Sequence, residues 1–410
     1  MGVGWVVRLS DDASTGTTSL LPDDQRNLSQ KRWLWIWALT SIMESIRPGP
    51  GMYWDKSHKI MHQGIPFLIS DFLLARLVEV TFVKMLPFVD ALLAADLDAT
   101  TDIITDGGNG AQVLSGKLQP LLDVRNALSS ASQVIELFRW ESSVELELKN
   151  RSDKLDEAIW NTMEDIRIGI LTPNNDDDDS KWGIQTPRGS SDIAKVTRSL
   201  IAYIESLWNN DRLLDKIVRT AAEFGSYVPN HDISSSLLLV ERHKTNPFTM
   251  LTLEMISSLE LKLAKRSESF PDHSLRFLFL INNTHFIRQQ LRPLFGMEFH
   301  LAILTSKIEE YIQKYLQVSW APVLSCLNNQ TPRWFRINSA LPKFDSEFQK
   351  TYDEQKFWKV PDPQLRTRLR KAIIERVVPA LTKYLEDNKI TDPGVTPQER
   401  EMMLLELFEG

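Results

Sequence analysis

Apolar residues recur every three to four positions over most of this chain, and long runs of alternating apolar and polar residues are few. This spacing is typical of amphipathic helices that pack into bundles. The sequence therefore predicts an all-α fold, and it shows no repeat of fixed period. The helical pattern starts near residue 31, and the clearest predicted helices lie near 67–95, 115–138, 141–171, 192–222, 248–266, 272–290, 297–318 and 319–328.

Proline, glycine and polar clusters divide these helices into groups. "RPGPGMYW" (47–54) forbids a continuous helix, Pro87 predicts a kink or junction, and "TDGGNGAQ" (105–112) predicts a loop. The predicted organisation is a polar N-terminal tail (1–31), a first helical bundle (32–175), an acidic exposed linker (176–191), a middle helical bundle (192–328) and a C-terminal helical bundle (329–410) that opens with a broken stretch, 329–343.

The stretch "WKVPDPQLRTRLRKAIIERVVPAL" (358–381) contains a clear helix start. A residue that precedes proline favours an extended backbone, so Asp362 is placed to cap a helix whose first residue is Pro363. Four apolar residues follow at four-residue spacing and predict its buried face: Leu365, Leu369, Ile373 and Val377.

The composition of the chain excludes several classes of function but adds little to the prediction of the fold. The 410 residues are 42% hydrophobic and 25% charged, with a net charge of −7, which argues against a general nucleic-acid binder. The single cysteine, Cys326, allows no disulfide within the chain and suits a reducing, cytosolic setting. The N-terminus lacks a secretory signal, and the longest apolar run, Trp33–Met43, is too short to span a membrane. Any membrane role is therefore predicted to be peripheral.

Patterns that carry enzyme or metal chemistry are weak in this chain. His58 and His62 stand one helical turn apart with Asp55 before them, but a zinc-protease glutamate does not accompany them. They are interpreted as histidines on a helix face. Cys326 is predicted to be a buried core thiol, and the acidic run Asp176–Asp179 to be a solvated loop. The sequence thus predicts no catalytic residue, no metal site and no cofactor.

Two surfaces are candidates for binding. Trp33, Trp35 and Trp37 cannot all face the same way on one helix, so some of these rings must be exposed or pack against other elements. They are candidates for a partner-binding surface, the alternative being core packing. Near the other end of the chain, residues 330–389 hold 13 Lys and Arg against 8 Asp and Glu. Arg366, Arg370 and Lys371 are the candidates there for contact with anionic lipid, the alternative being solvated helix faces.

Several motifs, in order, resemble the plant form of the seventy-kilodalton subunit of the exocyst, the vesicle-tethering complex. "WKVPDPQLR" is similar to that family's Trp-x-Val-Pro-Asp-x-x-Leu-Arg pattern, and "INNTHFI" (281–287) to an Asn-Asn-x-x-Tyr-Ile segment with Phe286 for Tyr. "FDSEFQK" (344–350) keeps Phe344 and Phe348 of a further motif. The segments "NPFTM" (246–250), "WAPVLSCL" (320–327) and "LFEG" (407–410) fit as well, and the resemblance covers residues 32–410.

This resemblance implies an elongated rod of stacked helical bundles without a catalytic site. It implies exocytosis, vesicle tethering and protein transport at the plasma membrane, with other exocyst subunits as partners and phosphoinositide membrane as a further one. Nucleic acid is not an expected partner. Two departures qualify the expectation. The family's long N-terminal coiled coil has no counterpart here, and its lipid-contacting lysines are replaced by "EDNKITDPGVTPQERE" (386–401). The alternative is a diverged paralogue outside the complex, an adaptor in plant defence that binds immune receptors or pathogen effectors.

Overall fold

The computed structural model describes residues 22–46, 52–54, 60–62, 76, 79–94, 110–137, 143–171, 191–230, 246–294, 297–327, 333–390, 394 and 396–410. The chain divides into two compact units. One comprises Met1–Gly169 with Asn209–Val228, and the other comprises Ile170–Trp208 with Pro229–Gly410.

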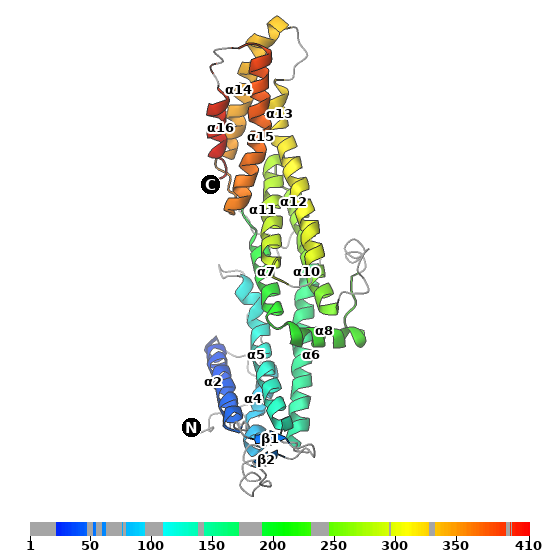
Figure 1. The fold of residues 1–410 in the computed structure, drawn as a ribbon. Coiled ribbons are helices and arrows are strands. Elements are labelled where there is room, and N and C mark those ends of the chain that lie inside the picture. The colour runs from blue at the N-terminus through cyan, green and yellow to red at the C-terminus, as the bar shows by residue number, and fades with distance from the viewer. Residues whose placement is uncertain are drawn as a thin grey trace. The chain divides into compact units, whose positions relative to one another are not determined.

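The first unit packs its helices around leucine, valine and aromatic side chains. Trp35 is completely buried, stacks on Phe88 with ring centroids 5.3 Å apart, and donates from Nε1 to the carbonyl of Met85 at 2.9 Å. The helices of this unit are labelled in Figure 1: α2 (Pro22–Ile46), α4 (Pro87–Ala94), α5 (Gly110–Leu137), α6 (Ser143–Leu171) and α8 (Asp211–Glu223).

A small hairpin accompanies these helices. β1 (Met52–Trp54) and β2 (Ile60–His62) pair antiparallel, with Met52 opposite His62. Each strand has only three residues, which is too short for an alternating pattern to reveal it. His62 therefore lies in a strand, and its interpretation as a residue on a helix face is wrong. Asp55 and His58 lie outside the described residues.

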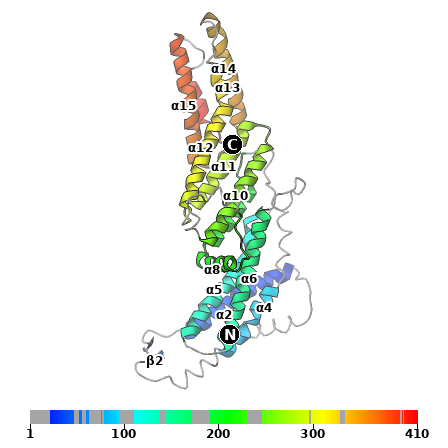
Figure 2. The same cartoon turned by 90° about the vertical axis from the view of Figure 1, so that its right-hand side faces the viewer.

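The second unit consists of helices that pack on one another. Helices α11 and α12 pack on one another and lie side by side in both views (Figure 1 and Figure 2). The helices of this unit are α7 (Lys195–Trp208), α10 (Pro247–Glu268), α11 (His273–Leu291), α12 (Glu298–Ser319), α13 (Ala321–Ser325), α14 (Arg333–Gln355), α15 (Pro363–Asp387) and α16 (Pro397–Leu405).

Capping side chains fix where these helices begin. Asn246 and Asp272 accept hydrogen bonds from the first free backbone N–H groups of α10 and α11. Thr396 and Glu399 form a reciprocal capping box at the start of α16. The end of α15 is fixed as well, since Lys389 adopts a φ of 52° and Ile390 N–H donates back to the Leu385 carbonyl at 3.0 Å.

The structure confirms the all-α prediction and changes several boundaries. Pro87 begins α4, as the predicted junction requires, and α2 begins at Pro22, within the predicted tail. Helix α5 starts at Gly110, inside the predicted loop 105–112. The predicted helix 192–222 is two helices that separate at Asn209–Asn210, where asparagine favours a turn.

The broken stretch predicted for 329–343 is wrong from Arg333 onward, because α14 runs through Pro342. A proline inside a helix removes one hydrogen bond. The buried side chains that follow it, Phe344, Phe348 and Tyr352, stabilise the helix as a whole. Most of the predicted linker, 176–190, lies outside the described residues. Its last residue, Ser191, is buried and not exposed. The five-part division into domains stays a prediction.

Candidate functional site

The second unit brings together motifs that are far apart in the sequence. Asn282 lies in the middle of α11 and is almost completely buried. Its side-chain amide donates to the carbonyls of Ser191, at 2.7 Å, and Lys359, at 3.0 Å. The Ser191 hydroxyl also donates to the Lys359 carbonyl at 2.7 Å. One asparagine therefore fixes the segment before α7 and the segment before α15 against α11.

The neighbouring Asn283 makes a second set of bonds. Its side-chain oxygen accepts from the backbone N–H of Ala194 at 2.9 Å and from the hydroxyl of Thr197 at 2.8 Å. Its side-chain nitrogen donates to the carbonyl of Phe279 at 2.9 Å. Because all these groups are buried, each bond prevents the cost of an unsatisfied polar group. The Asn-Asn pair thus holds the start of α7 on α11.

Aromatic residues from two further motifs meet in the core around α14. Phe348 lies within 5.8 Å of Trp320 and 5.9 Å of Phe344, measured between ring centroids. The indole N–H of Trp320 donates to the Tyr315 hydroxyl at 3.2 Å, and that hydroxyl donates to Gln355. The indole and the phenol therefore lie in the core with their polar atoms paired, as buried tryptophan and tyrosine require.

The Pro-Asp-Pro segment acts as the predicted helix start. Asp362 Oδ1 accepts from the backbone N–H of Leu365 at 2.7 Å, and Pro363 is the first residue of α15. The predicted apolar stripe of Leu365, Leu369, Ile373 and Val377 is buried throughout. His285 Nε2 lies 3.4 Å from the same Asp362 carboxylate, although burial lowers the pKa of this imidazole.

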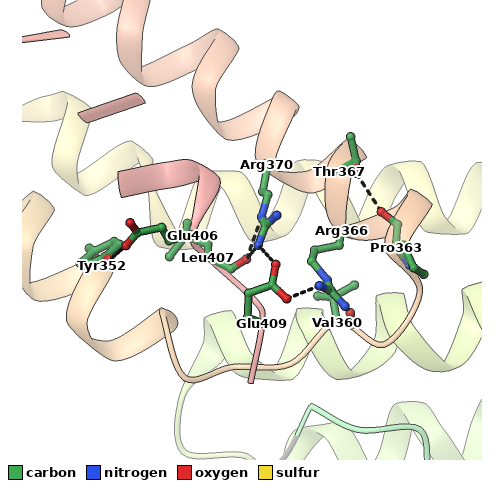
Figure 3. A network of polar contacts seen from close by, with 9 residues as sticks. All are labelled: Tyr352, Val360, Pro363, Arg366, Thr367, Arg370, Glu406, Leu407 and Glu409. Atoms are coloured by element: carbon green, nitrogen blue, oxygen red, sulfur yellow. Dashed lines mark hydrogen bonds and ion pairs between the residues drawn. The ribbon is translucent and has the colours of Figure 1, made fainter. Parts of the chain in front are cut away.

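Two of the three lipid candidates converge on a single carboxylate. Figure 3 shows the Glu409 side chain between Arg366 and Arg370, which lie one turn apart on α15. Arg370 Nη2 donates to Glu409 Oε1 at 2.7 Å, and Arg366 Nη1 donates to the other oxygen. Hydrogen bonds from Arg370 and Arg366 lower the pKa of Glu409. The third candidate, Lys371, is exposed and lies 3.7 Å from Glu375 on the same helix.

The two guanidinium groups are also fixed by backbone carbonyls. Arg366 Nε donates to the Val360 carbonyl at 3.1 Å, and Arg370 Nε donates to the Leu407 carbonyl at 2.8 Å (Figure 3). Lys359 and Glu409 form an isolated antiparallel bridge, and Val360 N–H donates to the Phe408 carbonyl at 3.2 Å. The segment 407–410 is thus tied to the segment 358–360 by backbone and side-chain bonds.

Phe408 anchors this C-terminal segment. Its side chain is completely buried, and its ring meets Tyr315 edge-on with centroids 6.3 Å apart. Its φ of 69° lies in the left-handed region, which is rare for a bulky residue. Sequence reasoning identified "LFEG" only as a matching motif and missed Glu409 as a binding partner, because nothing local relates it to arginines about forty residues earlier.

The tryptophans of α2 divide as the helical geometry requires. Trp35 is buried, whereas Trp33 and Trp37 are 60% and 53% exposed on the other side of the helix, with Leu34 between them 47% exposed. The Arg32 guanidinium lies 5.4 Å from the centre of the Trp33 ring. Of the three candidates, only Trp33 and Trp37 are thus available to a partner.

Cys326 is the remaining candidate for reactive chemistry that the structure describes. The Cys326 thiol donates weakly to the Pro322 carbonyl at 3.6 Å. Its side chain is only half-buried, so the prediction of a buried core thiol is wrong. Burial raises the pKa of this thiol. Within the ranges given above, no three His, Cys, Asp or Glu side chains are arranged to hold a metal ion. The acidic run Asp176–Asp179 lies outside those ranges.

Comparison with known proteins connects this arrangement to one family. The family model for the C-terminal part of the Exo70 exocyst complex subunit matches residues 93–400. The Arabidopsis thaliana exocyst complex component EXO70C1 is 24% identical over 340 residues, which are 74% of this chain and 49% of that protein. Exocyst complex component EXO70E2 of the same plant is 29% identical over 178 residues, covering 40% of this chain and 27% of that protein.

Among solved structures, the S. cerevisiae exocyst component Exo70p is 14% identical with a TM-score of 0.48, covering 98% of this chain and 95% of that one. This chain spans about half or less of the length of the curated Arabidopsis thaliana relatives that it matches. The family match covers three quarters of the chain and includes helices α11, α14 and α15. This chain belongs to the Exo70 family of exocyst complex subunits.

Proposed function

We propose that this protein is a non-catalytic exocyst subunit that contributes to vesicle tethering, exocytosis and protein transport by binding other macromolecules. The observation that carries the proposal is the family match over residues 93–400, together with relatives that are themselves exocyst complex components. Other exocyst subunits are accordingly its proposed partners.

The buried contacts of the second unit support a role for this unit as a rigid scaffold that presents a binding surface. Asn282 and Asn283 bind backbone groups of two other segments, and the aromatic cluster around Phe348 fills the core beside them. Most polar atoms of this network are paired, Asn282 Oδ1 being the exception, and buried hydrogen bonds of this kind rigidify the elements that they join. A rigid bundle loses little conformational entropy when it binds a partner, which favours recognition by its surface.

The exposed face of α2 is the proposed partner-binding surface. Trp33, Leu34 and Trp37 are about half exposed and lie on one side of the helix. Tryptophan is enriched at the centres of protein interfaces because its large ring buries much area at a small entropic cost. The buried Trp35 keeps the helix in place from its other side.

Association with the plasma membrane or with vesicles is proposed to be peripheral. In the described part of the chain, every helix is too short or too polar to span a bilayer. Lys371 is the most exposed of the three lipid candidates, whereas Arg366 and Arg370 are largely covered and hold Glu409. Contact of these residues with phosphoinositide stays a prediction.

Affinity purification of the tagged protein from the tissue that expresses it tests the proposal. We expect other exocyst subunits to be enriched over a tag-only control. Trp33→Ala with Trp37→Ala should reduce the capture of the partner that α2 binds, whereas Phe224→Ala, which removes another highly exposed aromatic ring, should not. A purification that contains none of the exocyst subunits would overturn the proposal. A defence receptor or a pathogen effector as the dominant partner would favour the alternative, an adaptor in immunity.

A further inference from the structure

The outer face of α16 carries apolar side chains that are exposed. Met402 and Leu405 are 60% and 51% exposed, and their spacing of three residues makes them neighbours on the helix surface. Leu404, which points away from Met402, is completely buried and holds the helix on the core of the second unit. The packing of α16 therefore leaves one apolar face without cover.

A third exposed apolar side chain, Phe357, is connected to this helix by a chain of contacts. Phe357 follows the end of α14 and is 72% exposed. Lys356 Nζ lies 5.1 Å from the centre of the Phe357 ring and 5.6 Å from that of the Tyr352 ring. The Tyr352 hydroxyl donates to Glu406, the residue after α16, at 2.7 Å (Figure 3). The end of α14 thus borders α16, and Phe357 extends the apolar surface.

Exposed carboxylates surround these three apolar residues. Each carboxylate lies three or four positions along the chain from one of them, which is the spacing of neighbours on a helix. Glu354 precedes Phe357, Glu401 precedes Leu405, and Glu399 and Glu406 lie on either side of Met402. The surface is therefore apolar at its centre and acidic at its rim.

Nearby cations do not neutralise this rim. Most of them are already bound to other carboxylates, and the pairs are Arg400 with Asp345, Lys356 with Asp353, and Arg366 and Arg370 with Glu409. Arg400, the basic residue of α16, is moreover only 11% exposed. Lys359 is exposed beside Phe357, but the carboxylates outnumber it. The charge that complements this surface is positive.

We propose that the outer face of α16, together with Phe357, binds a basic amphipathic helix of a partner protein. Such a helix presents apolar residues three and four positions apart, which fit beside Met402 and Leu405, and its flanking Lys and Arg meet the acidic rim. Three side chains bury less than the roughly 1,200 Å² of a stable interface, so the complex is transient. The surface lies in the other unit from Trp33 and Trp37, and the inference does not depend on membership of the exocyst.

The acidic rim distinguishes this partner from two others. A second copy of the chain would place the same carboxylates against each other, and like charges across an interface cost several kcal/mol. An anionic membrane surface attracts basic segments and repels acidic ones. Charge complementarity thus selects a basic protein segment.

A synthetic 14-residue peptide of leucine and lysine, with its leucines at helical spacing, tests the surface of the full chain. Fluorescence anisotropy of the labelled peptide measures binding. We expect Met402→Ser with Leu405→Ser to weaken binding at least about fivefold, because the apolar contact is lost. Leu146→Ser is the matched control, since Leu146 is 71% exposed on α6 between Glu145 and Glu147. It should change binding less than about twofold.

Charge variants test the same surface independently. Glu401→Lys should weaken binding at least about threefold, and high salt should reduce this effect because it screens exposed charges. Glu145→Lys, which makes the same change of charge beside Leu146, should change binding less than about twofold. A peptide with glutamate in place of every lysine should bind at least about tenfold more weakly than the basic peptide.

Several outcomes would overturn the proposal. One is equal weakening by Leu146→Ser and the Met402→Ser, Leu405→Ser double variant, and another is equal binding of the acidic and basic peptides. Self-association of wild type in sedimentation velocity that the double variant abolishes would assign the face to a second copy. Binding to phosphatidylserine vesicles that the double variant abolishes would assign it to a membrane. If the double variant fails to fold by circular dichroism, Glu401→Lys decides, since this side chain is exposed.

Discussion

The hydroxyl of Thr197 in α7 donates to the side-chain oxygen of Asn283 in α11 across a distance of 2.8 Å, and both residues are completely buried. This bond is one of several that Asn283 makes to the segment before α7 and to its own helix. It joins two helices through residues that are 86 positions apart in the chain. The bonds of Asn283 to Ala194, Thr197 and Phe279 are buried, so the loss of this side chain should be costly.

Asn283→Ala is expected to destabilise the second unit by roughly 2–4 kcal/mol, because it leaves several buried donors and acceptors unsatisfied. Urea unfolding followed by circular dichroism measures the change. Gln289→Ala is the control, since this exposed amide on the same helix makes only one long hydrogen bond, at 3.3 Å to Asp362. We expect the control to cost less than about 0.5 kcal/mol. Equal losses of unfolding free energy in the two variants would contradict a special contribution of Asn283 to stability.

Trp35→Ala and Trp33→Ala should differ strongly in the stability of the first unit. Trp35 is fully buried, stacked on Phe88 and bonded to the Met85 carbonyl, so its loss should cost about 3–5 kcal/mol. Trp33 is largely exposed, and its removal should cost less than about 1 kcal/mol. Thermal unfolding of both variants makes the comparison, and a larger loss in Trp33→Ala would show that α2 is packed through its other face.

Asp362→Ala should destabilise α15 by about 1 kcal/mol, because the helix loses the carboxylate that accepts the Leu365 N–H. Asp362→Asn retains an acceptor at this position and should recover most of that loss. Asp387→Ala is the control at the other end of the same helix. This carboxylate is exposed beside the negative end of the helix dipole, so its removal should be neutral or slightly stabilising. Chemical unfolding measures all three variants.

His300 should make the stability of the second unit depend on pH. Burial and the nearby Lys307 lower the pKa of His300 from 6.5 to about 4, although a Glu260 oxygen lies 3.9 Å from Nε2. The unfolded chain therefore binds more protons than the folded chain between pH 6.5 and 4. Stability falls as the pH is lowered through this window, by about 3 kcal/mol in total.

His300→Gln isolates this contribution from that of its neighbour. Burial raises the pKa of Glu260, which acts in the opposite direction because the folded carboxyl then keeps its proton to a higher pH. Glu260 is present in both proteins, so the difference between wild type and His300→Gln at pH 7 and pH 4.5 reports His300. A loss of stability on acidification that is the same in both proteins would assign the pH dependence to other groups.

Local pattern was sufficient for several features of the second unit. The Pro-Asp-Pro segment specifies a helix start because the proline before Asp362 and the one after it restrict the backbone wherever they occur. The stripe Leu365, Leu369, Ile373 and Val377 specifies the buried face because its spacing matches the helical period. The same periodicity separates Trp35 from Trp33 and Trp37.

Other features depended on partners that are distant in sequence. The helix through Pro342 persists because Phe344 and Phe348 find a core on other helices, which outweighs the local effect of proline. Ser191 is buried because Asn282 and Lys359 bind it, although its own sequence neighbours are those of an exposed linker. Arg366 and Arg370 appear in the sequence as surface cations, and only the folded chain brings Glu409 to them.

The sequence by itself determined the helical class of this protein, the start of α15 with its buried stripe, and the set of motifs that resemble the exocyst subunit. These follow from short-range restrictions on the backbone and from a periodicity that is independent of the rest of the chain. Only the tertiary structure decided which charges are free and which are already bound. The attraction between Glu409 and its arginines depends on their distance in space, and that distance is set by Phe408 in the core.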